Sequence, residues 1–263
     1  MPAGGVLGLS QGVRDVSPLE LTGERTMPGI AEENYWFRRH EAAYLQLAPL
    51  VTGGPLLEVG AGEGYGTALL AERADLVCAL DYDAAAIGHL ASRYPQLGAL
   101  RANLAALPVA AHSIEFLVSL QVIEHVWDHR QFLAECRRVL RPAGLLMLST
   151  PNRLTFSAEA SRPRNPFHTH EFTAAELTGL VRASGFTVCS LVGLHASDRL
   201  RELDRKYGGF VATQLDSPPL DWPAELLAEV RAVTAADFPL ASFDAEDPAI
   251  DASLDLIVLA RPV

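Results

Sequence analysis

Short apolar runs alternate with amphipathic stretches along most of the chain. The apolar runs have the length of buried strands, and between them apolar residues recur every three or four positions, as on one face of a helix. The expected strands span residues 56–59, 76–80, 99–102, 114–120, 144–149 and 186–192. The expected helices span residues 64–73, 84–93, 129–140 and 174–184. This alternation predicts an α/β fold in which a mostly parallel sheet carries helices on both faces and binds ligands at the carboxyl ends of its strands.

The last apolar run departs from this alternation. Residues 253–260 have no helix after them, and we expect them to form the seventh strand, antiparallel to the others. Residues 193–252 form an insertion before that strand, with expected helices at 197–207 and 224–234. Long insertions often carry function or subunit contacts, so this one is a candidate surface for the substrate or for a homodimer.

The N-terminal part of the chain differs in composition from the rest. Residues 1–20 are rich in Gly, Pro and Ser and are expected to be a mobile tail. Residues 21–55 contain an amphipathic helix at 32–47 and are expected to fold as a helical lid. The main domain is expected to span residues 56–263.

Charge and cysteine content exclude several classes of protein. The 263 residues carry 21 basic and 32 acidic side chains, and the net charge of −11 would repel a nucleic acid. Cys78, Cys136 and Cys189 are odd in number and far apart, so we expect neither a disulfide framework nor a cysteine metal site. No apolar run approaches the roughly 20 residues of a membrane span, and the chain start lacks the charged region of a signal peptide. A cytoplasmic protein is therefore expected.

A glycine-rich loop joins the first expected strand to the first expected helix. Glu58 is followed at alternate positions by Gly60, Gly62 and Gly64. Glycines allow a sharp turn and let a ligand approach the main chain closely. The dinucleotide fingerprint requires a third glycine three residues after the second, where this chain has Tyr65. The loop therefore departs from the pattern of nicotinamide enzymes.

Polar residues follow the next three strands. Asp81 lies at the distance along the chain at which an acid can hold ribose hydroxyls, and Tyr82 can flank an adenine. Asn103 and Leu104 offer an amide and an apolar side chain to an adenine edge. The segment from Gln121 through Glu124 and His125 follows the fourth strand.

Together these motifs resemble the class I S-adenosylmethionine-dependent methyltransferases, over residues 56–151. The resemblance implies a Rossmann-like sheet of seven strands, with S-adenosylmethionine as cofactor and S-adenosylhomocysteine as product. It places the glycine loop around the methionine moiety, Asp81 at the ribose and Gln121 near the sulfonium. The family often has Asp where Asn103 stands, which leaves the contact to adenine N6 open. The implied cofactor-binding residues are Glu58, Gly60, Gly62, Gly64, Asp81, Tyr82, Asn103, Leu104 and Gln121.

A narrower resemblance runs from residue 21 to the C-terminus. Segments 21–29, 33–40, 165–171 and 253–260 are similar to mycobacterial methyltransferases encoded with the enzymes of methylglucose lipopolysaccharide synthesis. This implies O-methylation of a sugar hydroxyl on a glucose-based polysaccharide or its precursor. Methylation of a mannoside or of a small phenol or quinone stays open. Two hypotheses from other classes also stay open: a nicotinamide oxidoreductase and a non-enzymatic binding module.

An alcohol acceptor must lose its proton as the methyl group is transferred, so a base or a metal ion is needed. His125 is the expected base, with Glu124 beside it to orient the imidazole, although His125 is equally suited to capping a helix. Glu124, His125 and Asp128 are also possible ligands of a divalent cation. Magnesium prefers oxygen ligands, and an acidic helix start explains two of these residues, so no metal site is expected.

Five further residues are candidates for contact with the acceptor. His168 and His170 lie in a Pro-containing loop after the fifth strand of the central alternation, and loops of this kind often carry function. Phe167 and Trp127 can stack on a sugar ring, although isolated aromatic residues are more often part of a core. His40 lies on the helix that is expected to fold across the cofactor.

Overall fold

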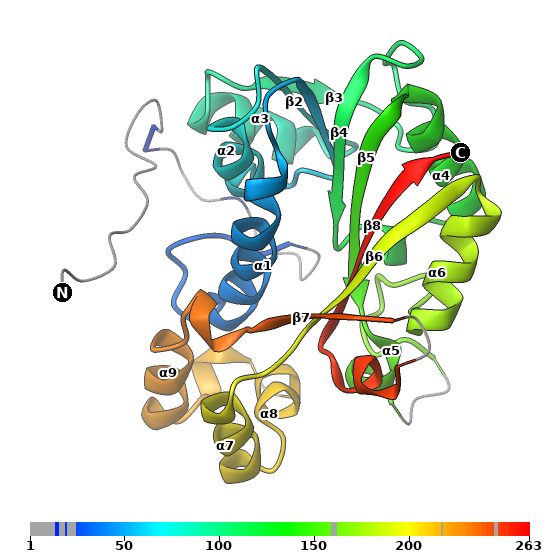
Figure 1. Ribbon diagram of the computed structural model, residues 1–263. Coiled ribbons are helices and arrows are strands. Elements are labelled where there is room, and N and C mark those ends of the chain that lie inside the picture. The colour runs from blue at the N-terminus through cyan, green and yellow to red at the C-terminus, as the bar shows by residue number, and fades with distance from the viewer. Residues whose placement is uncertain (1–13, 16–18, 20–24, 159–161, 217, 245–246) are drawn as a thin grey trace, which may run out of the picture.

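A computed structural model describes residues 14–15, 19, 25–158, 162–216, 218–244 and 247–263 (Figure 1). The predicted tail, residues 1–20, lies outside the described residues except at positions 14, 15 and 19, and so does the start of the predicted lid at 21–24. No helix in the described ranges is long and apolar enough to cross a bilayer.

One mixed sheet forms the centre of the described structure. Its strands are β1 (Pro55–Val59), β2 (Leu76–Asp81), β3 (Gly98–Arg101), β4 (Ile114–Leu120), β5 (Leu140–Pro151), β6 (Phe186–Leu194), β7 (Leu240–Phe243) and β8 (Asp255–Pro262). Their spatial order is β3-β2-β1-β4-β5-β8-β6-β7. The four strands before β5 run parallel to their neighbours, whereas β8 is antiparallel to both β5 and β6, as the sequence predicted.

The sheet has eight strands, so the prediction of seven was wrong. The additional strand is β7, which lies inside the predicted insertion 193–252 and pairs antiparallel with β6 at the sheet edge. Its four residues are all partly or fully exposed, so no alternation of buried and exposed positions marks it as a strand. A short edge strand of this kind is recognised through its hydrogen bonds to β6 and not through its own sequence.

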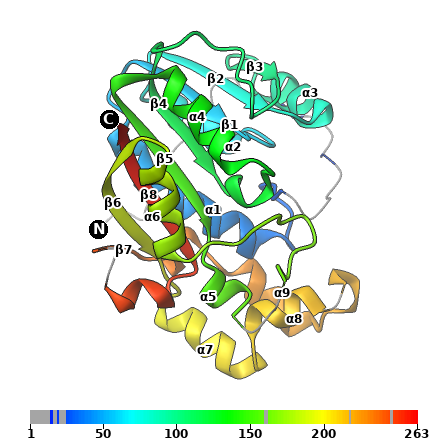
Figure 2. The ribbon, with the colours of Figure 1, turned by 90° about the vertical axis from the view of Figure 1, so that its right-hand side faces the viewer.

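Helices cover both faces of the sheet (Figures 1 and 2). They are α1 (Asn34–Leu47), α2 (Tyr65–Ala71), α3 (Ala84–Arg93), α4 (His129–Val139), α5 (Arg153–Phe156), α6 (Ala174–Ala183), α7 (Asp198–Tyr207), α8 (Phe210–Asp216) and α9 (Ala224–Arg231). Successive residues of β1 point to opposite faces of the sheet. Leu56 packs in the hydrophobic cluster that contains α1 and α2, and Leu57 packs in the cluster that contains α4 and α6.

The predicted lid helix and the predicted insertion pack together as one layer. The Asn34 side-chain amide donates to the carbonyl oxygens of Val230 and Val233, each at 2.9 Å. The ring of Tyr35 meets those of Phe210 and Phe238 edge-on, with centroids 5.6 and 5.4 Å apart. Helix α1 is therefore held in the core by the insertion, and Figure 1 shows it next to α9.

A buried ion pair fixes α1 to the C-terminal strand β8. Arg39 donates from Nε and Nη2 to the two carboxylate oxygens of Asp255, each at 2.6 Å, and Nη2 also donates to the carbonyl oxygen of Leu254 at 2.7 Å. Both side chains are only 3% exposed. Two parallel hydrogen bonds between fully desolvated charges fix the geometry of the pair, and neither charge can be removed alone without leaving the other uncompensated.

We expect Arg39→Met to lower the free energy of unfolding by about 3–5 kcal/mol, because Asp255 would be left buried without its counter-charge. Urea denaturation followed by circular dichroism measures the change. The matched control is the double variant Arg39→Met/Asp255→Asn, which should recover part of the loss because the buried negative charge is gone as well. A single variant within about 1 kcal/mol of the wild type would contradict this role of the pair.

Candidate functional site

The turn between β1 and α2 forms one wall of a pocket. Gly60 and Gly62 have φ angles of 80° and 53°, in the left-handed region that L side chains rarely adopt. A Cβ atom on Gly60 would come within 2.4 Å of the Val122 side chain, whereas one on Gly62 would meet open space. The backbone amides of Gly60 and Ala61 both donate to the carbonyl oxygen of Leu80, at 2.7 and 3.0 Å. The turn is therefore fixed against β2 with space beside Gly62 for a ligand.

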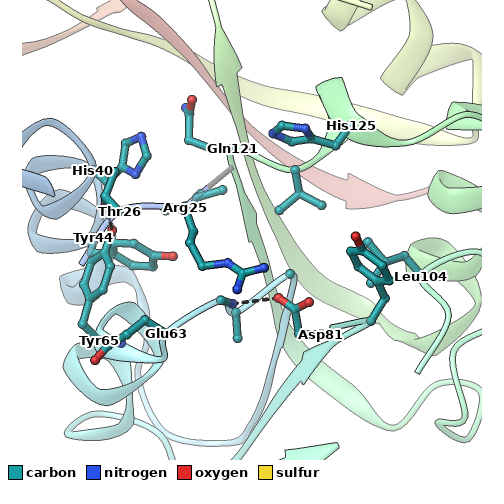
Figure 3. A pocket seen from close by; sticks show the side chains of 16 residues that line it. Arg25, Thr26, His40, Tyr44, Glu63, Tyr65, Asp81, Leu104, Gln121 and His125 are labelled. Atoms are coloured by element: carbon teal, nitrogen blue, oxygen red, sulfur yellow. Dashed lines mark hydrogen bonds between the residues drawn. The ribbon is translucent and has the colours of Figure 1, made fainter. Parts of the chain in front are cut away.

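Asp81 connects this turn to the end of β2. One carboxylate oxygen accepts from the Gly62 amide at 2.8 Å, and the other accepts from the Asp83 amide at 2.9 Å (Figure 3). Each oxygen retains a lone pair for a further donor. The residue is 8% exposed and lines the pocket, so its carboxylate is placed to accept hydrogen bonds from the two hydroxyls of a ribose.

The pocket contains most of the residues that the sequence assigned to the cofactor. Those that line it are Gly60, Gly62, Asp81, Tyr82, Leu104 and Gln121. Gly64, Glu58 and Asn103 do not line it. Gly64 faces Leu90 at the start of α2, and the Asn103 side chain accepts from the Ala105 amide at 2.9 Å, which stabilises a turn.

Glu58 lies beneath the pocket. It is 1% exposed, and its carboxylate accepts hydrogen bonds from the Tyr44 hydroxyl at 2.5 Å and from the Thr67 hydroxyl. Burial raises its pKa to about 7, partly offset by these two donors. Tyr44 itself lines the pocket, so Glu58 holds one of the pocket's side chains in place.

The sequence assigned no cofactor contact to several residues that line the same pocket. Arg25 extends across it from the segment before α1 (Figure 3). It forms an ion pair with Asp83 at 2.6 Å. Thr26, Tyr44 and Glu63 also line it. Arg25 and Thr26 belong to segment 21–29, one of the segments that carry the resemblance to the mycobacterial methyltransferases. The sequence does not show that they lie beside the glycine turn; only the fold places them there.

A second, wider cleft adjoins the cofactor pocket. It has a volume of about 530 Å³, and its aromatic lining comes from Trp36, Phe156 and Phe167. The cleft and the cofactor pocket share five lining residues, which are Arg25, Thr26, His40, Gln121 and His125. The two cavities therefore adjoin at these side chains.

His125 lies where the two cavities meet. Its Nδ1 is 3.1 Å from the carbonyl oxygen of Phe167, and because a carbonyl can only accept, Nδ1 carries the hydrogen and Nε2 has the free lone pair. Burial lowers the pKa of His125 to about 4; the adjacent His168 also lowers it, and the Phe167 carbonyl raises it slightly. The imidazole is therefore neutral near pH 7.

Glu124 does not orient His125, contrary to the sequence-based hypothesis. Its carboxylate accepts from the Thr150 hydroxyl at 3.0 Å, and the Phe167 carbonyl orients the imidazole instead. Glu124 is 1% exposed, and burial raises its pKa to about 8. Asp128, a possible metal ligand from the sequence, caps α4 by accepting from the Gln131 amide at 3.0 Å.

The candidate acceptor residues separate into two groups. His40, Phe167 and His168 line the wide cleft. His170 does not: its ring packs on Phe172 with centroids 4.5 Å apart. Trp127 is also absent from the lining and is 90% exposed.

We expect Asp81→Ala to weaken binding of S-adenosylhomocysteine about 100-fold, since hydrogen bonds to a charged group contribute about 1.5–3 kcal/mol each. Calorimetric titration measures the affinity. Asp75→Ala is the matched control, because Asp75 directly precedes β2, at the opposite end of that strand from Asp81, and its carboxylate accepts from the Gly54 amide at 2.8 Å. Equal affinity of the Asp81 variant and the wild type would show that this carboxylate does not contact the ligand.

Comparison with known proteins agrees with this geometry. Residues 57–148 match the family model described as a methyltransferase domain. A probable S-adenosylmethionine-dependent methyltransferase of Mycolicibacterium smegmatis is 49% identical over 250 residues, covering 94% of this chain and 96% of the relative. One of Mycobacterium tuberculosis is 49% identical over 251 residues, covering 93% and 90%.

The fold is also shared with solved structures. A methyltransferase of Thermotoga maritima, described as a possible histamine N-methyltransferase, superimposes with a TM-score of 0.59 at 18% identity, over 86% of this chain and 92% of that one. The identity to the two mycobacterial relatives extends over nearly the whole length of both partners. The chain therefore belongs to the S-adenosylmethionine-dependent methyltransferases, and S-adenosylmethionine is its cofactor.

Proposed function

We propose that this enzyme is an O-methyltransferase that acts on a sugar hydroxyl of a glucose-based polysaccharide or its oligosaccharide precursor, in the synthesis of methylglucose lipopolysaccharide. The observation that carries the proposal is the wide cleft that opens from the cofactor pocket at His125. Flat aromatic faces next to polar groups suit a sugar ring, which has apolar C–H faces and a polar edge.

The aromatic lining of the cleft is held by mutual packing. The rings of Trp36 and Phe156 meet edge-on with centroids 6.4 Å apart, and Phe156 lies 5.5 Å from the ring of His168. Phe167 is 44% exposed, so its face is available to an acceptor. His40 and Gln121 add polar side chains to the lining. A cleft of this size and lining accommodates more than the reacting sugar ring, as a polysaccharide precursor requires.

The residues at the junction have two tasks. They place the acceptor hydroxyl next to the cofactor pocket, and this proximity supplies much of the acceleration of a displacement reaction. They also remove the hydroxyl proton, a task that we assign to His125, whose Nε2 has a free lone pair. S-adenosylmethionine supplies the methyl group: its sulfur–carbon bond breaks as the oxygen–carbon bond forms, and the electron pair stays on sulfur to give S-adenosylhomocysteine.

Incubation with isotopically labelled S-adenosylmethionine tests the proposal. The acceptors are oligoglucosides, oligomannosides and a small dihydroxyphenol in parallel, and mass spectrometry detects transfer. We expect methylation of the oligoglucosides, with the label on a ring oxygen by nuclear magnetic resonance. Transfer to the mannosides or to the phenol alone would contradict the glucose assignment and support one of the other O-methyltransferase classes.

We expect His125→Ala to reduce turnover roughly 10²–10⁴-fold with nearly unchanged affinity for S-adenosylhomocysteine. Loss of proton removal acts on the chemical step, whereas the cofactor is held mainly by the glycine turn and Asp81. His125→Asn is the matched variant, because its amide can still donate to the Phe167 carbonyl without providing a base. If both variants keep wild-type turnover, His125 has no part in proton removal.

A further inference from the structure

Three potential metal ligands converge where the acceptor cleft meets the cofactor pocket. Glu124, His125 and His168 each offer one ligand atom, and these atoms lie within 4.8 Å of one another. Glu124 and His125 belong to a short helical turn after β4, Ile123–His125, whereas His168 comes from the loop before α6. All three line the acceptor cleft.

The loop that carries His168 is fixed to the turn that carries the other two residues. The Thr169 amide and hydroxyl both donate to the carbonyl oxygen of Glu124, at 2.7 and 3.0 Å. The same hydroxyl is 2.7 Å from the carbonyl oxygen of Val126. The cluster is therefore held together by the backbone on both sides and does not depend on a chance approach of mobile side chains.

Both imidazoles are oriented in the way that metal-binding histidines are. Nδ1 of His168 donates to a carboxylate oxygen of Glu171 at 2.8 Å, and Nδ1 of His125 donates to the Phe167 carbonyl at 3.1 Å. Histidines that ligate metals almost always donate their second ring nitrogen to a carboxylate or carbonyl in this manner. Each ring is thereby left with Nε2 as its free electron-pair donor.

From this geometry we propose that Glu124, His125 and His168 bind a divalent transition-metal ion that coordinates the acceptor hydroxyl. Two imidazoles and one carboxylate suit Zn²⁺, Mn²⁺, Fe²⁺ or Co²⁺ better than Mg²⁺. A four-coordinate ion with ligand bonds of about 2.1 Å holds its ligands about 3.4 Å apart, so the ligand atoms, now within 4.8 Å of one another, would approach by up to about 1.4 Å around it. Three protein ligands leave coordination positions free toward the cleft.

The inference rests on the proposed function but replaces His125 as the base, because an Nε2 bound to a metal ion has no free lone pair to accept a proton. A hydroxyl bound to a divalent cation has a lowered pKa, so its proton can pass to water in the cleft. His125 then acts on the acceptor as a ligand of the ion, and His168 becomes as necessary as His125. The sequence analysis expected no metal site because it took Asp128 as the third ligand. In the structure the third residue next to Glu124 and His125 is His168, and Asp128 caps α4.

Titration of the metal-stripped enzyme with Co²⁺ tests the site. Calorimetry gives the affinity, and visible absorption bands report the coordination of the ion. We expect one Co²⁺ per chain and at least about 100-fold weaker binding in His168→Ala and Glu124→Gln. The control is His170→Ala, a histidine two positions along the same loop that packs on Phe172, which should bind Co²⁺ as the wild type does.

Three results would overturn the proposal. They are absence of Co²⁺ binding by the wild type, equal binding by His168→Ala, and full methyl transfer by the metal-stripped enzyme. The titration contains neither S-adenosylmethionine nor a sugar, so its outcome is independent of the acceptor. Failure of the sugar assignment would leave Co²⁺ binding intact, whereas failure of the metal site would leave sugar methylation by the stripped enzyme intact.

Discussion

The buried ion pair of Arg39 and Asp255 determines how helix α1 lies against the C-terminal strand β8. Because both charges are desolvated and joined by two hydrogen bonds of 2.6 Å, α1 must lie against β8 in one orientation. That orientation brings Trp36 and His40 of the same helix to the acceptor cleft. The helix predicted as a lid is thus part of the core, and the wall of the cleft depends on the pair that anchors it.

The cofactor side is built from a different constraint, the strained turn after β1. Positive φ angles at Gly60 and Gly62, together with the amide bonds to Asp81 and Leu80, hold the backbone open beside β2. Gln121, at the end of β4, has a φ of 57° and donates from its side chain to Ser149. It links the two cavities, and its unusual backbone conformation is a cost that the surrounding strands β4 and β5 offset.

The sequence predicted the central alternation well because buried strands and amphipathic helices leave a periodic signal. It missed α5, α8 and β7, which have only four to seven residues each and are too short to show that signal. The sequence could predict that Asp81 and His125 lie near one cavity, because topology places the ends of parallel strands together, and both residues line it. The sequence could not show that Arg25 lines the pocket or that His168 lies next to Glu124, because contacts between distant segments leave no local pattern.

The account depends on two adjoining cavities that share Gln121 and His125 in their lining, which we propose to hold the cofactor and the acceptor. A crystal structure with S-adenosylhomocysteine bound tests it most directly. We predict that the ribose hydroxyls contact Asp81 and that the sulfur faces the wide cleft beside His125. A sulfur atom directed away from His125, or closed off from the cleft by protein, would contradict both the placement of the acceptor and the assigned role of His125.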